Sequence, residues 1–375
     1  MRNIFLKSRV NTFEEKPIKI LLTGGGSGGP TQPLIAVAEE VKKKYISSQF
    51  LFLGSNNGPE KIMVEKSKIK FVAIPSGKLR RYWSLRNFLD PVFIILGGIF
   101  GFFHLLHFRP QIIISAGSFV SVPVAYSAWI LRLPHIILQM DVRPGLANII
   151  MAPVSTALIY YFDSTANHFS SIPLKCKIGP VVRDEIYKSN PERANKIFGL
   201  DPKKPLILIT GGGQGSADLN RIISPFLKHW LLNFQVVHLI GLNAMNDLMI
   251  ENSNFSHPNY HPIELVNEGM GDLINRSDIV FSRAGMGIVG ELSVLKKDCV
   301  LIPLPGTHQE ENAKFFESKN AINFVRQEEL KIKGLKWWEF FLKNRAPGQT
   351  GERLNNIFPK EGTKEFAKFI FEIIN

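Results

Sequence analysis

Cysteine is scarce in this sequence. Only two cysteines, Cys176 and Cys299, occur among 375 residues, and they do not form a C-x-x-C pair. This excludes a disulfide framework and is typical of a reducing compartment. Arg/Gly-rich tracts and zinc-ligand clusters are also missing, so nucleic acid is not an expected partner. No long apolar core accompanies Arg2, Lys7 and Arg9, and we therefore expect no signal peptide.

Acidic residues are too few to balance the basic ones. The chain has 32 Asp and Glu against 45 Lys and Arg, which gives a formal net charge of +13. Such an excess favours nucleic acid, an anionic membrane or phosphorylated substrates as the partner. Since the sequence carries no nucleic-acid motif, the other two classes are the ones to test.

One ten-residue segment occurs twice. Ile20–Gly29 returns 187 residues later as Ile207–Ser216, with seven identical positions. Each copy is an apolar run that breaks into glycines and then enters a helical pattern. This predicts a buried strand, a loop with free backbone amides and a helix N-terminus, a corner that suits phosphate. Two such corners predict two α/β domains with a phosphorylated ligand between them.

The first glycine loop formally contains G-x-G-x-x-G, at Gly24, Gly26 and Gly29. A nicotinamide site would also need an acidic residue at the end of the second strand, but that strand ends at Leu53 and Gly54 without one. Neither loop continues into Gly-Lys-Ser/Thr, which excludes a P-loop. Two interpretations stay open: a diphosphate site built from backbone amides, or tight turns without a ligand.

Short apolar runs alternate with helical patterns in both halves of the chain, which predicts parallel sheets covered on both faces. The fold class is therefore α/β, with two Rossmann-like parallel-sheet domains facing across a cleft. The predicted strands cover residues 18–23, 49–53, 71–74, 111–115, 135–139, 206–210, 235–240, 278–282 and 299–303. The predicted helices cover residues 31–44, 122–131, 216–227, about 288–295, 307–319 and 364–374.

Composition also suggests how the chain is divided. Residues near 175–205 are polar and rich in proline, as in an interdomain linker, whereas residues 331–360 look irregular and receive no role. We place an N-terminal domain at 1–178, a C-terminal domain at 179–360 and a closing helix at 361–375.

Several residues of the second half suit a nucleotide sugar. Glu291 lies about one turn into the helix that follows Gly285 and Gly287, where a carboxylate can accept ribose hydroxyls or simply face the helix dipole. His308 and Gln309 open another helix after a strand, where ligands of α/β sheets gather. The T-x-x-E sequence at residues 307–310 has the form of a capping box. Surface solvation is the alternative for His308.

Arg183 lies where the predicted linker enters the second domain. Its guanidinium fork could pair with a diphosphate near the hinge. A lone surface arginine is the alternative.

One apolar stretch, residues 91–106, complicates a plain soluble interpretation. It is shorter than the roughly 20 residues of a spanning helix. Basic and aromatic side chains precede it, namely Lys78, Arg80, Arg81, Tyr82, Trp83 and Arg86. A core helix, a helix dipping into an anionic membrane surface and a true span all stay open.

Taken in order, these segments resemble the MurG family, the glycosyltransferases that move N-acetylglucosamine from UDP-GlcNAc onto lipid-linked muramyl-pentapeptide in peptidoglycan synthesis. The resemblance runs from about Ile20 to Val325. It rests on both glycine loops, residues 116–121 and 145–148, the 283–291 segment, and His308-Gln309 with Asn312-Ala313.

The resemblance implies a GT-B fold and inverting transfer without metal or cofactor. The donor, UDP-N-acetylglucosamine, would be held by Arg183, Gly213, Gln214, Arg283, Gly285, Gly287, Glu291, His308 and Gln309. The diphosphate of a polyprenyl-pyrophosphate-linked acceptor would be held by Gly25, Gly26, Ser27, Gly28, Gly29, Gly117, Ser118 and Asn148. The resemblance also implies that the protein docks peripherally on the cytoplasmic face of the cell membrane. Residues about 80–107 would contact the anionic inner surface of that membrane.

The sequence departs from the family pattern in the first glycine loop, where Pro30 replaces the usual histidine and can carry no proton. Asp141 is the nearest carboxylate by motif position, and we name it as the candidate general base. Gly213 replaces a usual serine. Two alternatives therefore remain: a related transferase with another lipid acceptor, or a non-catalytic UDP-sugar binder.

Overall fold

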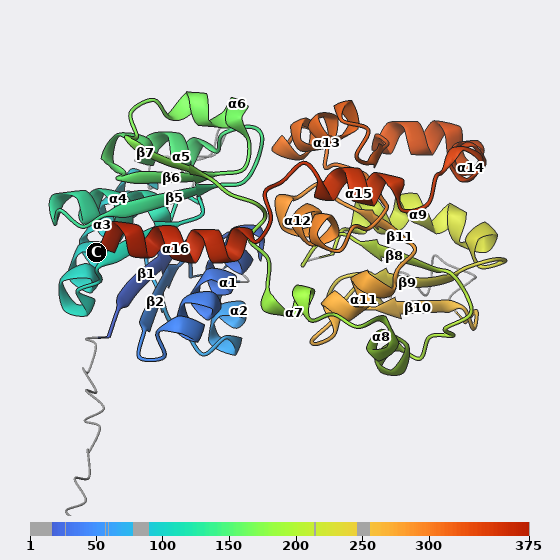
Figure 1. The fold of residues 1–375 in the computed structure, drawn as a ribbon, viewed down its shortest axis with the longest axis horizontal. Helices are drawn as coiled ribbons and strands as arrows, with labels where there is room; N and C mark the ends of the chain where they lie inside the picture. The colour runs from blue at the N-terminus through green and yellow to red at the C-terminus, as the bar shows by residue number, and fades with distance from the viewer. Residues whose placement is uncertain are drawn as a thin grey trace, which may run out of the picture.

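A computed structural model of the chain describes residues 17–26, 28–56, 58, 60–77, 90–213, 215–245 and 256–374. Two α/β domains lie side by side along the long axis of the molecule (Figure 1). Each contains a parallel sheet with helices on both faces. The predicted fold class is thus confirmed.

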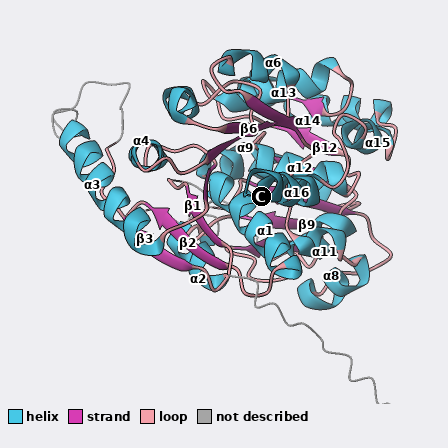
Figure 2. Ribbon diagram, turned by 60° about the vertical axis from the view of Figure 1, so that its left-hand side comes forward, coloured by secondary structure: helices cyan, strands magenta, loops and turns pink. Residues whose placement is uncertain are grey.

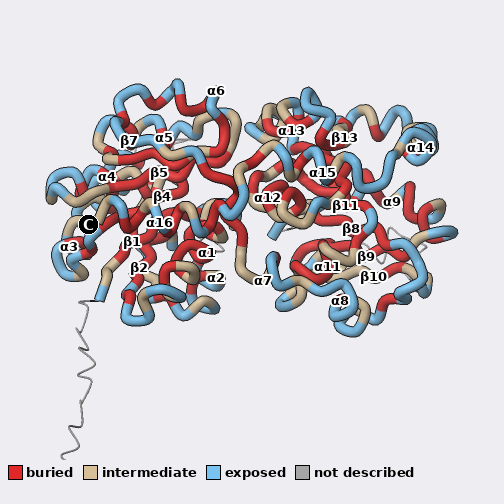
Figure 3. The backbone as a smooth tube through the Cα atoms, in the orientation of Figure 1, coloured by how far each residue is buried: buried red, intermediate tan, exposed pale blue. Residues whose placement is uncertain are grey.

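The N-terminal domain is built on a seven-stranded parallel sheet in the order β3-β2-β1-β4-β5-β6-β7. The strands are β1 Lys19–Thr23, β2 Gln49–Gly54, β3 Lys70–Ala73, β4 Ile112–Ser115, β5 His135–Gln139, β6 Ala157–Tyr160 and β7 Leu174–Lys177. Its helices are α1 Gly28–Lys44, α2 Glu60–Lys66, α3 Asp90–Phe108, α4 Ser121–Ile130, α5 Leu146–Met151 and α6 Asp163–Ala166. The central strands are buried along their whole length, as parallel strands between two helical layers must be (Figure 3).

The C-terminal domain is built on a six-stranded parallel sheet in the order β10-β9-β8-β11-β12-β13. The strands are β8 Leu206–Thr210, β9 Gln235–Leu239, β10 Tyr260–Ile263, β11 Ile279–Ser282, β12 Cys299–Leu301 and β13 Asn323–Phe324. The helices are α7 Asp184–Tyr187, α8 Pro191–Phe198, α9 Ala217–Trp230, α11 Met270–Arg276, α12 Met286–Val294, α13 His308–Ser318, α14 Gln327–Asn344, α15 Gln349–Asn355 and α16 Gly362–Ile374. Four short strands, β6, β7, β10 and β13, escaped the sequence analysis.

The expectation of an irregular stretch at residues 331–360 is wrong. It is mostly helical, in α14 and α15, and a non-helical residue, Gly334, kinks α14. Trp338 is buried against Trp230 and Phe281, so this segment closes the core of the C-terminal domain. The carboxylate of Asp298 accepts hydrogen bonds from the amides of Gly348 and Gly351 at the start of α15.

The expectation of a linker at residues 175–205 is also corrected, because this range contains β7, α7 and α8. Asn190 caps α8 and Gly199 ends it in a left-handed conformation, which accounts for its polar, turn-rich composition. Arg193 ties α8 to Asp272 of α11 at 2.6 Å.

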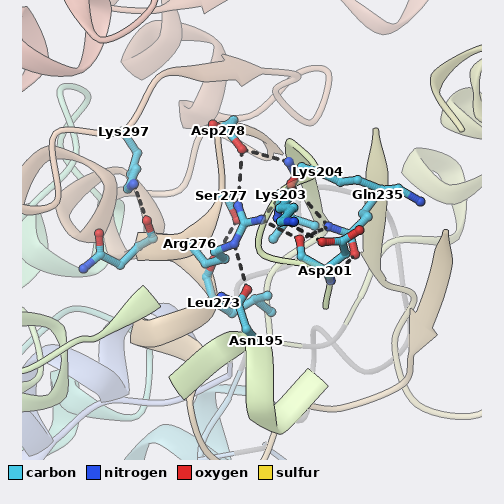
Figure 4. Close-up of polar contacts among 12 residues, drawn as sticks. Asn195, Asp201, Lys203, Lys204, Gln235, Leu273, Arg276, Ser277, Asp278 and Lys297 are labelled. Carbon is cyan, nitrogen blue, oxygen red and sulfur yellow. Dashed lines mark hydrogen bonds and ion pairs between the residues drawn. The ribbon is translucent and has the colours of Figure 1, made fainter. Parts of the chain in front are cut away.

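A polar cluster fixes the edge of the second sheet where its strands begin (Figure 4). Arg276 donates to Asn195 Oδ1 at 2.8 Å and to the Lys204 carbonyl at 2.7 Å. Asp278 accepts from the amide of Leu206 at 2.8 Å. These bonds hold the entry to β8, and they lie at the opposite end of that strand from the second glycine loop.

The closing helix α16 crosses back to the N-terminal domain (Figure 1). Phe371 packs against Tyr45, with ring centroids 4.4 Å apart. Thr363 Oγ1 exchanges hydrogen bonds with the backbone of Val182, at the crossing between domains. The described elements are compatible with a division near 178, which stays a prediction.

Candidate active site

The first glycine loop follows β1 and leads into α1, but its polar groups are not all free. Glu60, a fully buried carboxylate at the start of α2, accepts hydrogen bonds from the amide of Gly26 at 3.2 Å and from the amide of Ser55 at 3.0 Å. A Cβ atom at Gly25 would overlap Glu60 Oε1. The expectation that all amides of this loop are free is therefore corrected at Gly26.

The remaining residues of this loop differ in their structural positions. Gly28 and Gly29 form the first turn of α1, and Ser27 lies outside the described residues. Pro30 also lies in this first turn, where the missing N–H costs no helical hydrogen bond.

The second loop of the N-terminal domain lies beside the first. Gly117 and Ser118 both have positive φ, and Ser118 Oγ is 3.9 Å from the position of a Cβ atom at Gly26. Asn148 reaches this corner from α5, where its amide oxygen is 3.4 Å from a Cβ position at Gly117. The fold thus brings Gly26, Gly117, Ser118 and Asn148 together, and their role in binding the acceptor diphosphate stays a prediction.

Asn148 carries an unused acceptor. Its amide nitrogen donates to Gln139 Oε1 at 2.7 Å, whereas its buried Oδ1 accepts from no described residue. A buried polar atom without a partner is costly, which sets Asn148 apart from the other polar residues of this corner.

In the second domain, Arg183 and Glu291 meet. Arg183 Nη2 donates to Glu291 Oε1 at 2.9 Å, and Arg183 Nη1 lies 2.5 Å from Glu185. Burial raises the pKa of the Glu291 carboxyl, and the Arg183 guanidinium partly opposes that shift. Arg183 is therefore not a lone surface arginine; its pairing with a diphosphate stays a prediction.

The start of α12 is open. Gly285 occupies the N-cap position without a side-chain cap, and Cβ atoms at Gly285 and Gly287 would lie more than 4 Å from every described heavy atom outside their immediate surroundings. Unfilled space at a helix N-terminus leaves its amides available to an anion.

Arg283 is buried and engaged within the protein. Its Nη2 donates to Ser216 Oγ at 2.8 Å, and its Nη1 donates to Gln327 Oε1 at 2.5 Å and to the Ile302 carbonyl at 3.0 Å. These bonds connect the second glycine loop with β12 and α14. These contacts favour a structural role for Arg283. Its direct binding of the nucleotide-sugar donor stays a prediction.

The second glycine loop itself is open at its tip. A Cβ atom at Gly213 would meet no described atom within 4 Å. Gln214 lies outside the described residues. Ser216 caps α9 by accepting from the amide of Leu219 at 3.3 Å.

Asp141 contacts the other domain. Its Oδ1 accepts from Asn312 Nδ2 of α13 at 2.9 Å and lies 3.8 Å from His308 Nε2. Asn312 Oδ1 in turn accepts from the amide of Val142 at 3.0 Å. The loop after β5 is therefore joined directly to the start of α13, which brings the predicted base beside a predicted donor residue.

Asn312 was absent from the predicted site residues, although its motif was noted. It is fully buried and also donates to the Ala284 carbonyl at 3.0 Å. Its spacing of one helical turn from His308 is the signal that places both on one face of α13.

The cap of α13 differs slightly from the predicted box. Thr307 accepts from the amide of Gln309 at 3.3 Å, one residue before the position that the box predicts. The Gln309 side chain folds back, and its Oε1 accepts from the amide of Leu304 at 3.0 Å.

Comparison with known proteins agrees with both domains. The sequence model of the glycosyltransferase family 28 N-terminal domain matches residues 20–159, and that of the family 28 C-terminal domain matches residues 206–337. The chain belongs to glycosyltransferase family 28. The first match thus spans β1 to β6 of the N-terminal sheet, and the second spans all six strands of the C-terminal sheet.

Curated relatives carry one name. The UDP-N-acetylglucosamine--N-acetylmuramyl-(pentapeptide) pyrophosphoryl-undecaprenol N-acetylglucosamine transferase of Clostridium botulinum (strain Kyoto / Type A2) is 35% identical over 333 residues, covering 87% of this chain and 92% of the relative. A Bacillus cereus protein of the same name, numbered 2, is 32% identical, covering 95% of this chain and 99% of the relative. The expected membership in this group of glycosyltransferases is confirmed.

Solved structures share the fold. MurG of Acinetobacter baumannii matches with a TM-score of 0.71 and 19% identity, over 95% of this chain and 99% of that one. The UDP-GlcNAc 2-epimerase of Neisseria meningitidis, solved with UDP-GlcNAc, matches with a TM-score of 0.64 and 18% identity, over 95% and 99%. At these identities the likeness shows the two-domain fold alone.

Proposed function

We propose that this glycosyltransferase moves N-acetylglucosamine from UDP-GlcNAc to a lipid-pyrophosphate-linked muramyl-pentapeptide. The observation that carries the proposal is the junction of Asp141 with Asn312 and His308, because it joins the predicted acceptor side to the predicted donor side. The names of the relatives supply the substrates.

The donor would lie at the open start of α12. The amides near Gly285 and Gly287 suit the diphosphate, and the partly buried carboxylate of Glu291 suits the ribose hydroxyls. Arg183 holds that carboxylate in place at 2.9 Å. Gly213, at the open tip of the second glycine loop, leaves room for the sugar phosphate beside it.

The acceptor would lie at the corner formed by Gly26, Gly117, Ser118 and Asn148. The unpaired Oδ1 of Asn148 suits a hydroxyl or amide of the acceptor. Because the amide of Gly26 already donates a hydrogen bond to Glu60, we assign the acceptor diphosphate chiefly to the Gly117-Ser118 turn.

Transfer would proceed by inverting displacement without a metal ion. The acceptor hydroxyl attacks the anomeric carbon while the bond to UDP breaks, and helix N-terminal amides stabilise the departing phosphate. A protein group must accept the hydroxyl proton, and Pro30 cannot do so.

The N-terminal domain would dock on an anionic membrane through α3. This is the one described helix that is long and apolar enough to cross a membrane, yet only 17% of its apolar window is buried. Ile95 and Phe103 are 64% and 63% exposed, which supports a surface helix over a core helix. Gly97 and Gly101 pack against neighbouring segments, so one face stays on the domain while the other is free to enter a bilayer surface (Figure 2).

The exposed apolar surface continues beyond α3. Trp129 and Ile130 at the end of α4, which packs beside α3, are also exposed. The basic and aromatic residues from Lys78 to Arg86 that were expected to flank this surface lie outside the described residues.

Membrane docking predicts a selective loss of vesicle binding. Ile95→Ser combined with Phe103→Ser should lower co-sedimentation with anionic phospholipid vesicles by about tenfold, since each removes apolar area from the bilayer. Ile62→Ser, on the equally exposed Ile62 of α2, is the matched control and should bind like the wild type. Equal binding by all three proteins would contradict the assignment.

The main test is transfer of radiolabelled N-acetylglucosamine from UDP-GlcNAc to the lipid-linked muramyl-pentapeptide in vesicles. We expect product with and without EDTA, with the anomeric configuration inverted by NMR. Absence of product from folded protein would refute the proposal.

Pro30 supports a second candidate, a related transferase with a different lipid acceptor. Pro30 lies on the acceptor side of the site, at the start of α1. Competition between acceptor lipids decides: if the muramyl-pentapeptide lipid outcompetes all others, this candidate is removed. UDP-GlcNAc binding without any transfer would instead indicate a non-catalytic binder.

A further inference from the structure

An imidazole and a carboxylate face each other from the two domains. His308 is the first residue of α13 in the C-terminal domain, and Asp141 follows β5 in the N-terminal domain. Their closest atoms, Nε2 and Oδ1, are 3.8 Å apart. This distance is too long for a hydrogen bond to a neutral ring, but it is an ion-pair distance once the ring is protonated.

The carboxylate is held firmly. Asn312 donates to Asp141 Oδ1 at 2.9 Å, and Gln139 Nε2 donates to the Asp141 carbonyl at 2.9 Å. Thr165 Oγ1 donates to the neighbouring Val142 carbonyl at 2.6 Å. Asp141 therefore has a fixed position, whereas the imidazole is half exposed and can reach a bound molecule.

The other charged groups near this pair are mostly acidic. Arg143 forms an ion pair with Glu311 at 3.5 Å, and Glu310 follows in the first turn of α13. Together with Asp141, these groups place three carboxylates and one guanidinium around His308.

We propose that His308 is the general base of this glycosyltransferase and that Asp141 is its positioning residue. The inference rests on the proposed function and assigns the proton transfer that Pro30 cannot perform. With Nε2 turned to Asp141, Nδ1 accepts the proton of the acceptor hydroxyl. That oxygen bonds to the anomeric carbon, and the electron pair of the breaking bond leaves with the β-phosphate of UDP.

Histidine suits this task better than aspartate. Its unperturbed pKa of about 6.5 lies close to neutral pH, where a base combines the correct protonation state with useful strength. Asp141 Oδ1 already accepts a hydrogen bond from Asn312, so this oxygen is engaged within the protein. A carboxylate that stabilises the imidazolium as it forms is a known division of labour in other enzymes.

The experiment compares three variants with the wild type in the vesicle transfer assay over pH 5 to 9. His308→Gln keeps a polar side chain of similar size and should lower kcat by about 100-fold or more, a far larger change than in UDP-GlcNAc affinity measured by calorimetry. Added imidazole should restore part of the rate. His229→Gln, in the last turn of α9, is the control and should match the wild type.

The pH profile separates the two roles. The wild type should lose kcat/KM on the acid side as its base becomes protonated, and His308→Gln should lack that acid limb. Asp141→Asn should keep the limb, shift it to lower pH and lower kcat by about tenfold, because the imidazolium loses its partner. Asp141→Glu should recover part of the shift.

Three outcomes overturn the inference. Full activity of His308→Gln removes His308 as the base while leaving the proposed function intact. Loss of the limb only in Asp141→Asn, with a limb near pH 4 in the wild type, makes Asp141 the base instead. Absence of transfer by the wild type, despite UDP-GlcNAc binding, refutes the proposed function and the inference together.

Discussion

The two glycine loops have almost the same sequence, but the side chains that contact them have opposite charges. In the first, the carboxylate of Glu60 accepts from the amide of Gly26 and fills the space beside Gly25. In the second, the guanidinium of Arg283 holds Ser216 at 2.8 Å, and the space beside Gly213 is open. One loop is therefore closed by the protein's own anion, whereas the other is braced by a cation and left open.

This difference shows that a glycine loop supplies amides but does not decide what they bind. The decision comes from the side chain that a neighbouring segment delivers. Glu60 comes from α2 and Arg283 from the end of β11, and neither lies in the repeated segment. An anion beside Gly25 and Gly26 would meet the Glu60 carboxylate, which is why we assign the acceptor diphosphate chiefly to the neighbouring Gly117-Ser118 turn.

The largest expected effect comes from removing the brace of the second loop. Arg283→Met should lower the free energy of unfolding by roughly 3 kcal/mol, because buried acceptors at Ser216, Gln327 and Ile302 lose their donor. Urea denaturation of the variant measures the loss. Arg283→Lys should recover part of it, and an unchanged midpoint would show that the brace is dispensable.

A matched pair of glycine substitutions compares the two loops directly. Gly25→Ala should destabilise by roughly 2–3 kcal/mol, since the new methyl group overlaps Glu60 at a positive φ. Gly213→Ala should change stability by less than about 0.5 kcal/mol, because its Cβ meets open space. Thermal unfolding of both variants tests the contrast; equal losses would contradict it.

Each domain also contains one fully buried histidine, so both should weaken in mild acid. Burial lowers the pKa of His135 to about 3 and that of His238 to about 3. The folded pKa lies below the unfolded value of about 6.5, so stability is complete above pH 6.5 and is lost as the pH falls toward 3. Between pH 6.5 and 5 we expect up to about 2 kcal/mol lost per histidine.

Urea titrations at several pH values check this symmetry. His135 bonds to Ser115 and Ser155, and His238 bonds to Asn220 and Tyr260. Acid sensitivity confined to one domain would show that the other histidine is not neutral in the folded state.

The smallest expected effect concerns the carboxylate that closes the first loop. Glu60→Gln should cost about 1–2 kcal/mol, because an amide can accept only some of the bonds from Gly26 and Ser55. The same variant should bind inorganic pyrophosphate several-fold more tightly than the wild type, since repulsion is removed. Calorimetry measures both proteins, with weaker binding as the contradicting result.

Local signals were strong where the pattern was long or repeated. The strands before both glycine loops, the α1 helix and the Thr307 cap follow directly from apolar runs and a capping residue. The four-residue strand β6 and the two-residue strand β13 were missed, because so few residues carry no periodicity. The buried Trp338 of α14 was missed for another reason: turn residues such as Gly334 hid a helix that tertiary packing stabilises.

The site residues likewise fall into those that local motifs predicted and those that only the structure revealed. The motifs pointed to Glu291, His308 and Asp141 individually, from their positions after strands and at helix starts. Their partners came from far along the chain: Arg183 for Glu291 and Asn312 for Asp141, 108 and 171 residues away. No local pattern reports such pairings.

The amino-acid order alone determined two parallel sheets, two glycine corners and a chemistry directed at phosphorylated sugars, because apolar periodicity and glycine act over a few neighbouring residues. Only the tertiary structure decided which corner stays open, which carboxylate meets which cation, and that α16 packs back on the first domain. Those outcomes depend on the approach of segments distant in sequence, where shape, burial and charge are settled together.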